Sequence, residues 1–344
     1  MTISKILKSV ALSALIIVAA PALSQDVDED INPYSKQHDF VVTLLGTGTP
    51  KPEPDRMGMS TLVQVNGMKF LFDAGRGNNI RLWQMGLNRG DLDAVFLTHL
   101  HSDHLVGLPD LLMSGWMIAN FKNHGDERPF VVYGPGEIEG RIGTTETVNR
   151  IKSAFEADQY IRRNDEKLNE TWIEIEGHDI SSSGVIYEKG GIRITAFSVD
   201  HGEWAKPNYG YRVDYDDRSV LLSGDARYSP DGELLTYAKD VDVLIHSVAA
   251  APDAILKTHV GEAVMGHHIS PQQAGEVFTQ SRPKLAVYSH IVLMGNPKAP
   301  RPNVSDIIEQ TRETYDGPLL VGSDLTSLII DKDGVTVKAY NATP

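Results

Sequence analysis

Short β-rich runs separated by turn residues dominate the chain from about residue 39 onwards. Residues 60–65 and 68–73 flank the pair Asn66-Gly67, and Asn-Gly between two such runs is the strongest short-range signal for a β-hairpin. Residues 209–225 repeat this plan around two aspartates. Each hairpin ends on an aspartate and is followed by a helical or turn segment and then an apolar run, so the two halves of the chain are variations on one β-rich unit.

Three apolar runs predict buried strands that close on histidine, namely residues 93–99, 242–246 and 284–290. Together with the hairpins they predict two sheets packed face to face with helices outside, one unit per half. The halves are not expected to be independent domains, because no Pro/Gly/Ser-rich linker separates them. Strands that deliver polar residues at their carboxyl ends into a common crevice are how α/β sheets build sites. Between them, residues 137–182 are polar and helical and predict a helical insertion near the mouth of the site.

The N-terminus has the pattern of a targeting segment. Residues 1–24 carry two lysines, then the apolar run 10–20, then small residues, which is typical of a cleavable signal peptide. The alternative is a membrane anchor, but about a dozen apolar residues fall short of the roughly 20 that cross a bilayer. We therefore expect a periplasmic or secreted protein without a stable membrane anchor, an acidic leader at 25–38 and a single domain at 39–344.

Composition narrows the chemistry. The 344 residues include no cysteine, which excludes disulfide scaffolds, thiol nucleophiles and iron-sulfur clusters. The formal charge is -14, and removing the signal peptide at 1–24 leaves 30 basic against 46 acidic residues, a charge of -16. Because binding to phosphate backbones needs clustered Lys and Arg, this balance disfavours nucleic acid as a partner unless the binding is local.

A dense group of metal-ligand side chains follows the strand at 94–97. After an extended strand, residues two apart point the same way, so His99 and His101 can address one metal while Asp103 and His104, round the turn, address a second. A His-rich surface loop is the alternative, but such a loop need not follow an apolar strand.

Further candidate ligands stand at the ends of later strands: His201, Asp225 and His290. Each is weak alone, because a strand-end histidine is more often a structural residue and Ser-Gly-Asp can be a plain turn. Taken together with 99–104, they resemble the metallo-β-lactamase superfamily, whose pattern His-x-His-x-Asp-His and then His, Asp and His matches without a gap. The resemblance covers residues 40–330 and implies an α/β fold, the four-layer αββα sandwich.

The resemblance also implies how the ligands divide between two zinc ions. One ion would be held by His99, His101 and His201. The other would be held by Asp103, His104 and His290, with Asp225 bridging the pair. Manganese or iron accepts the same ligands. The bridging aspartate separates this chain from lactam-cleaving members and makes it similar to the ribonuclease Z, zinc-type arylsulfatase and class II phosphodiesterase branch.

With two zinc ions and no thiol, the economical nucleophile is a metal-bridging hydroxide that Asp103 orients. His268 is the candidate proton donor to the leaving group. It precedes residues 270–273, where Ser-Pro-Gln-Gln forms a capping box at a helix N-terminus, and ribonuclease Z-like enzymes have a similar His-x-[ST] there. The alternative is that one residue of the pair His267 and His268 only packs against the helix.

Three further residues have two interpretations each. Asp73 either accepts a hydrogen bond from a ligand imidazole or closes the hairpin. His246 resembles the family's histidine behind the ligands, and a purely structural role is equally compatible. Trp204, close to His201, either walls an aromatic leaving group or packs in the core.

The sequence therefore favours an exported dinuclear zinc hydrolase acting on a small-molecule sulfate ester or phosphodiester. One alternative is a ribonuclease Z-like tRNA 3′ endonuclease, which export, the charge of -16 and the lack of a Gly/Pro-rich basic arm oppose. Others are a lactonase or other ester hydrolase of the same fold, and a metal-dependent binding protein without turnover. The oligomeric state is left open, with a dimer among the options.

Overall fold

The computed structural model describes residues 34–122 and 129–339. The expected signal peptide at 1–24 and most of the acidic leader lie outside the described residues, so the signal peptide, the export that it implies and the acidic leader stay predictions. Within the described part of the chain, no helix is both long and apolar enough to cross a membrane.

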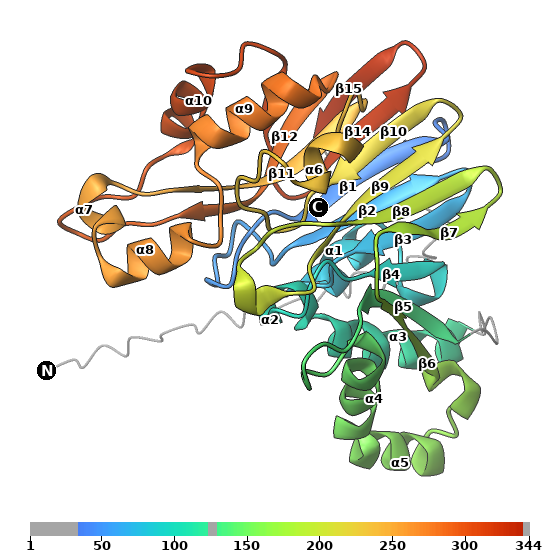
Figure 1. The fold of residues 1–344 in the computed structure, drawn as a ribbon. Helices are drawn as coiled ribbons and strands as arrows, with labels where there is room; N and C mark the ends of the chain where they lie inside the picture. The colour runs from blue at the N-terminus through green and yellow to red at the C-terminus, as the bar shows by residue number, and fades with distance from the viewer. Residues whose placement is uncertain (1–33, 123–128, 340–344) are drawn as a thin grey trace, which may run out of the picture.

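Two β-sheets form the centre of the molecule (Figure 1). The eight-stranded sheet has the order β15-β14-β1-β2-β3-β4-β5-β6, with β1 (Phe40–Gly46), β2 (Ser60–Val65), β3 (Met68–Phe72), β4 (Ala94–Phe96), β5 (Phe130–Pro135), β6 (Ile175–Ile180), β14 (Thr326–Asp331) and β15 (Gly334–Ala339). The seven-stranded sheet has the order β13-β12-β11-β10-β9-β8-β7, with β7 (Gly184–Lys189), β8 (Ile192–Ser198), β9 (Tyr209–Tyr215), β10 (Arg218–Leu222), β11 (Val243–Ala250), β12 (Leu285–Leu293) and β13 (Leu319–Val321).

Apolar side chains from both sheets meet in one buried core. Alternate residues along a strand face the partner sheet, and Phe72 and Phe96 of the first sheet lie 5.5 and 5.6 Å, centroid to centroid, from the ring of Tyr211 in the second. Burying aromatic rings of this size contributes much of the hydrophobic free energy of such a core. The sheets are therefore packed face to face, as the sequence predicts.

Helices cover the outer faces of both sheets. Figure 1 shows α9 and α10 on one side and α1, α3 and α4 on the other. Trp116 of α3 is fully buried on the outer face of the first sheet, and Phe278 of α9 on that of the second. The helices are α1 (Asn78–Gln84), α2 (Ser102–Leu105), α3 (Leu108–Lys122), α4 (Thr144–Ala154), α5 (Glu156–Asp165), α6 (Glu233–Tyr237), α7 (Asp253–Leu256), α8 (His259–Met265), α9 (Pro271–Ser281) and α10 (Val304–Arg312), with short 3-10 turns η1 (Arg89–Asp91), η2 (Glu170–Ile173) and η3 (Glu203–Ala205). The fold is the four-layer αββα sandwich.

The two halves repeat one pattern, as their sequences indicate. In each, an antiparallel hairpin is followed by two strands in parallel, β2-β3-β4-β5 in the first and β9-β10-β11-β12 in the second. Parallel strands bring their carboxyl ends to the same edge, so the loops after β4 and after β10 can meet. The division into halves is not complete, because the C-terminal hairpin β14-β15 joins the first sheet beside β1.

The segment 137–182 differs in part from its prediction. Helices α4 and α5 form there, but residues 175–180 are strand β6, which pairs in parallel with β5. Val148 of α4 is fully buried in the outer core of the first sheet. The segment is thus part of the sheet and of its outer layer, rather than a helical insertion. Its sparse apolar residues are enough to cover an edge strand.

Candidate metal centre

The first group of ligands follows strand β4 and enters helix α2. His101 stands at the helix N-cap with extended backbone, at φ -65 and ψ 147, so the chain remains extended through His99 to His101 and both rings point the same way. The His99 Nε2 and His101 Nδ1 atoms lie 2.9 Å apart. Asp103 and His104 belong to the single turn of α2, and both are buried.

The second group comes from the other sheet. His201 follows β8, and Asp225 follows β10. His290 does not end its strand as predicted, because β12 continues to Leu293; the register against β11 shifts around it, and its φ is +46. A bulge inserts a residue and redirects a side chain, and here it turns His290 towards the crevice without ending the strand.

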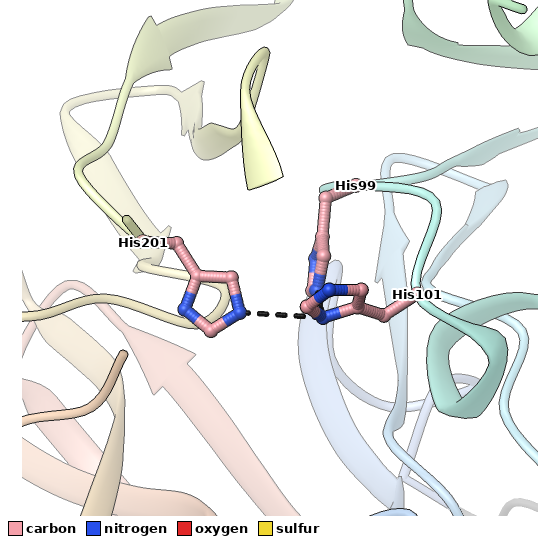
Figure 2. Close-up of side chains that lie close together, drawn as sticks. All are labelled: His99, His101 and His201. Atoms are coloured by element: carbon pink, nitrogen blue, oxygen red, sulfur yellow. Dashed lines mark hydrogen bonds between the residues drawn. The ribbon is translucent and has the colours of Figure 1, made fainter. Parts of the chain in front are cut away.

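The seven candidate ligands converge between the two sheets. Ligand atoms lie within 4.8 Å of one another in each of two groups, namely His99, His101 and His201, and Asp103, His104 and His290. In Figure 2, His201 approaches His99 and His101 from the opposite loop, with its Nε2 3.3 Å from the Nδ1 of His101. The structure therefore brings together residues that are as much as 191 positions apart, between 99 and 290.

Asp225 lies between the two groups. Its Oδ2 is 3.6 Å from the Nε2 of His104 in one group and 3.7 Å from the Nε2 of His201 in the other. Its Oδ1 is 3.3 Å from the Nδ1 of His290. A carboxylate in this position can offer one oxygen to each of two neighbouring cations, as its predicted bridging role requires.

Buried polar atoms at the centre have no hydrogen-bond partner. These are the Nε2 of His104, the Oδ1 of Asp225 and the Nδ1 of His290. A buried polar atom left unpaired costs about 1–3 kcal/mol, and native structures keep few of them without a functional reason. Nitrogen and carboxylate donors that face one another in this way fit divalent cations. The fold and these clusters make the chain a binder of divalent metal.

The pKa shifts of two candidate ligands suit metal binding, and that of a third opposes it. Burial would lower the pKa of His104, but Asp73 and Asp225 hold it well above its ordinary value. Burial, together with the neighbouring His104, lowers the pKa of His99 well below its ordinary value. Burial would raise the pKa of Asp225, but His290 and His104 outweigh it and hold that pKa well below the usual range. A neutral imidazole and an ionised carboxylate are the forms that coordinate a cation.

Hydrogen bonds behind the ligands fix how the rings point. His104 Nδ1 donates to Asp73 Oδ2 over 2.8 Å, and the Thr98 amide donates to Asp73 Oδ1, also over 2.8 Å. His201 Nδ1 donates to the carbonyl oxygen of His267 over 2.7 Å. Of the two interpretations of Asp73, the structure therefore shows the acceptor for a ligand imidazole, and its φ of +58 turns the chain at the end of β3.

His268 lies at the site and His246 lies behind it. The His268 Nδ1 is 3.9 Å from Asp225 Oδ2, and its ring centroid is 5.5 Å from that of His290. Burial lowers the pKa of His268 to about 4. His246 Nδ1 instead donates to the Ser247 carbonyl, and its ring packs edge-on against Phe278, which favours the structural interpretation of His246.

A cavity of about 220 Å³ opens over the ligands. It is lined by Pro50, His101, Asp103, His201, Asp225, Ala263, Val264, His267, His268 and His290. Trp204 is not among these residues, and its side chain is 78% exposed. The core-packing interpretation of Trp204 is therefore wrong, because its turn leaves the ring in solvent. A role beside the leaving group stays a prediction.

A second cavity, of about 390 Å³, adjoins the first and was not predicted. Pro50 and His290 line the metal cavity, whereas their neighbours Lys51 and Ile291 line this one. Its wall carries three cationic side chains and one acidic side chain, Lys51, Arg56, Arg301 and Glu53. Sequence reasoning could not find it, because the loop at 48–56 and the loop at 294–304 meet only in the fold.

Comparisons with known proteins agree with this geometry. Residues 68–291 match the family described as beta-lactamase superfamily domain. The chain is 39% identical over 208 residues to a ribonuclease Z of Mycobacterium marinum, covering 60% of this chain and 70% of the relative. It is 34% identical over 255 residues to a ribonuclease Z of Mycobacterium sp. (strain KMS), covering 72% and 83%.

Solved structures show the same fold. A metallo-β-lactamase fold protein from Bacillus subtilis superposes with a TM-score of 0.62 at 16% identity, covering 84% of this chain and 98% of that one. The short form of human tRNase Z superposes with a TM-score of 0.59 at 21% identity, covering 83% and 98%.

Two predictions are overturned by these relatives. The main functional prediction, an exported arylsulfatase-like hydrolase of small esters, is wrong, because the curated relatives are ribonucleases Z. The prediction of a small-molecule partner instead of nucleic acid is wrong for the same reason. It rested on the net charge, which sums over the whole surface and so misses the local group of cations beside the metal cavity. The chain is a metal-dependent hydrolase of phosphodiester bonds.

Proposed function

Since the chain belongs to the beta-lactamase superfamily and, within it, to the ribonuclease Z family, we propose that it is an endonuclease that cleaves precursor tRNA on its 3′ side. The observation that carries the proposal is the position of Asp225, within 3.7 Å of ligand atoms from both groups. A site for two adjacent cations suits phosphodiester cleavage, because two metals can stabilise both the attacking and the leaving oxygen.

We propose zinc as the metal at both positions. Divalent ions bound here would stabilise negative charge on the phosphoryl oxygens and would lower the pKa of a bound water towards about 7. His-rich donor sets with carboxylates suit zinc, although manganese and iron accept similar ligands. Metal analysis of protein purified without added metal tests this assignment.

Asp103 and His268 are suited to the two proton transfers of hydrolysis. Asp103 is 4% exposed and lines the cavity, and His290 Nε2 lies 3.1 Å from its Oδ2. Its carboxylate can orient the attacking water and accept a proton. His268 lies between α8 and α9 and lines the same cavity, so it can carry a proton for the departing oxygen. Because burial lowers its pKa to about 4, His268 is neutral at pH 7 and must gain a proton when the anionic phosphodiester binds if it is to donate one.

The cationic cavity gives an RNA chain a place to continue beyond the metals. Lys51 and Arg301 share the carboxylate of Glu53, and Arg56 donates to the Thr47 hydroxyl and the Gly322 carbonyl. Three cations against one carboxylate leave a local positive charge next to the cleavage site. Such clustering is what phosphate binding needs, whatever the net charge of the protein.

The test compares substrates with one purified, zinc-loaded preparation. We expect cleavage of precursor tRNA on its 3′ side, and loss of that cleavage in Asp225→Ala. Asp240→Ala is the matched control, because this carboxylate is 57% exposed and pairs with Arg282 on the surface; its activity should equal that of the wild type. Hydrolysis of bis-nitrophenyl phosphate without any cleavage of precursor tRNA would overturn the proposed function.

A further inference from the structure

Trp204 is a large apolar side chain held in solvent close to the metal centre. It belongs to η3 and is 78% exposed, whereas Trp116 is fully buried. It follows His201 by three positions, so the two Cα atoms lie within about 11 Å of each other, the span of three extended residues. The turn appears in yellow-green beside α2 in Figure 1. The turn that carries the indole therefore lies beside the site.

Hydrogen bonds hold the backbone around Trp204, although its side chain does not pack in the core. The guanidinium of Arg141 donates to the carbonyl oxygen of Trp204. Asp200 accepts a hydrogen bond from the Gly202 amide over 3.0 Å and pairs with Arg227 over 2.7 Å. These contacts join the loop to both halves of the molecule, so the indole is presented by a rigid turn.

Gly202 adds a steric constraint on the same turn. Its φ is +100, and a Cβ added there would lie 2.6 Å from the ring of His267. The close approach seats the turn against a residue that lines the metal cavity. Packing of Gly202 against His267 at the cavity wall thus constrains the path of the turn.

Charged side chains lie on and beside the turn that carries the indole. Lys206 and Glu203 are exposed on the same loop. Arg141, whose side chain is 37% exposed, donates to the Trp204 carbonyl and pairs with Glu139. Exposed aromatic side chains beside cations are the elements that bind single-stranded nucleic acid, since bases stack on the ring while cations meet the phosphates. A substrate whose phosphodiester occupies the metal cavity has bases on either side of that bond.

We propose that Trp204 stacks on a nucleobase close to the cleaved bond and so positions the RNA strand across the metal centre. The proposal rests on the proposed function and adds to it the element that recognises unpaired bases. It assigns a base-stacking contact to the loop that follows His201.

The test measures the KM for precursor tRNA and the quenching of tryptophan fluorescence on RNA binding. Removal of a base-stacking aromatic weakens binding by roughly 5- to 150-fold, so we expect the KM of Trp204→Ala to rise within that range and Trp204→Phe to recover part of the loss. The quenching should disappear in Trp204→Ala. Trp83→Ala is the matched control, because Trp83 is 49% exposed on helix α1; it should retain both the wild-type KM and the quenching.

Substrates with a single abasic nucleotide locate the contact. We expect one position near the cleavage site at which base removal raises the KM of the wild type but not that of Trp204→Ala. An unchanged KM in Trp204→Ala overturns the inference, as does an equal loss on precursor tRNA and on bis-nitrophenyl phosphate, which has no nucleobase. A change in sedimentation of Trp204→Ala without a change in KM assigns the indole to a second copy of the chain instead.

The outcomes separate this inference from the proposed function. RNA that quenches Trp204 but is not cleaved overturns the proposed cleavage and supports the stacking contact. Cleavage that is indifferent to Trp204 overturns the stacking contact alone. A wild-type protein that neither binds nor cleaves precursor tRNA overturns both.

Discussion

His104 donates a hydrogen bond from its Nδ1 to the Oδ2 of Asp73 over 2.8 Å, and both side chains are at most 1% exposed. The bond joins helix α2 to the end of strand β3 and leaves the other ring nitrogen facing Asp225 at 3.6 Å. A carboxylate behind a ligand imidazole fixes its tautomer and raises its basicity. The orientation of a metal ligand therefore depends on a residue in the first hairpin.

Replacing Asp73 should weaken metal binding without removing a ligand. We expect Asp73→Asn to lower the affinity of the site by about 10- to 100-fold, the usual effect of losing such a partner. A competition titration with a metal-binding dye measures it, with Asp240→Asn as the surface control. Wild-type affinity in Asp73→Asn would show that His104 is oriented by other contacts.

Removing Arg301 should weaken RNA binding in a salt-dependent way. Arg301 is 52% exposed and lines the cationic cavity. Losing one phosphate contact should make the slope of log affinity against log salt concentration shallower by about 1. Filter binding of precursor tRNA to Arg301→Ala measures this slope. Arg282→Ala, 60% exposed and paired with Asp240, is the control, and equal slopes in the two variants would place the RNA elsewhere.

Removing the ring of Phe96 should destabilise the fold. Phe96 is fully buried and stacks on Phe72 and Tyr133 at centroid distances of 5.1 and 5.0 Å. Truncating such a ring costs about 3–5 kcal/mol of unfolding free energy. Urea unfolding of Phe96→Ala measures the loss, and Val337→Ala, 42% exposed on β15, should stay within about 0.5 kcal/mol of the wild type. A loss below about 1 kcal/mol would contradict the packing of the two sheets described above.

The ion pair between Asp39 and Arg218 should contribute to the loss of unfolding free energy at acidic pH. The hydrogen bond from Arg218 Nη1, 2.6 Å from Asp39 Oδ1, lowers the pKa of Asp39 below its ordinary 3.8, although burial opposes it. A lowered pKa stabilises the fold above 3.8, and this stabilisation is lost as the pH falls through the lower, folded value. Asp39→Asn should therefore be less stable than the wild type at pH 7, with a smaller difference at pH 3.

Urea unfolding at both pH values checks this prediction. Asp253→Asn, an exposed carboxylate on α7, is the control and should follow the wild type at each pH. A difference between Asp39→Asn and the wild type that grew on acidification would contradict the assigned sign.

Local spacing explains why much of the site could be predicted. His99, His101, Asp103 and His104 lie within six positions, so the strand and the turn alone bring them together. The hairpins also followed from the chain, because alternation and turn residues are local signals. The other three ligands follow His104 by 97, 121 and 186 positions, so only the resemblance joined them to it.

What the sequence missed depends on contacts between distant segments. A bulge in β12 redirects His290, and nothing in its neighbours marks that bulge. The choice between two roles for Asp73 needed the position of His104, and the cationic cavity needed two loops to meet. Net charge misled for the same reason, since it contains no information on where Lys51 and Arg301 lie. The exposure of Trp204 is likewise a property of the folded turn.

Titrating metal-free protein with Zn²⁺ while precursor tRNA cleavage is followed tests the paired cation site most directly. We expect cleavage to rise to a plateau at two ions per chain. Asp225→Ala should bind fewer ions and show no cleavage at any zinc concentration. Full cleavage by the metal-free protein, or by Asp225→Ala, would contradict a paired cation site as the centre of the reaction.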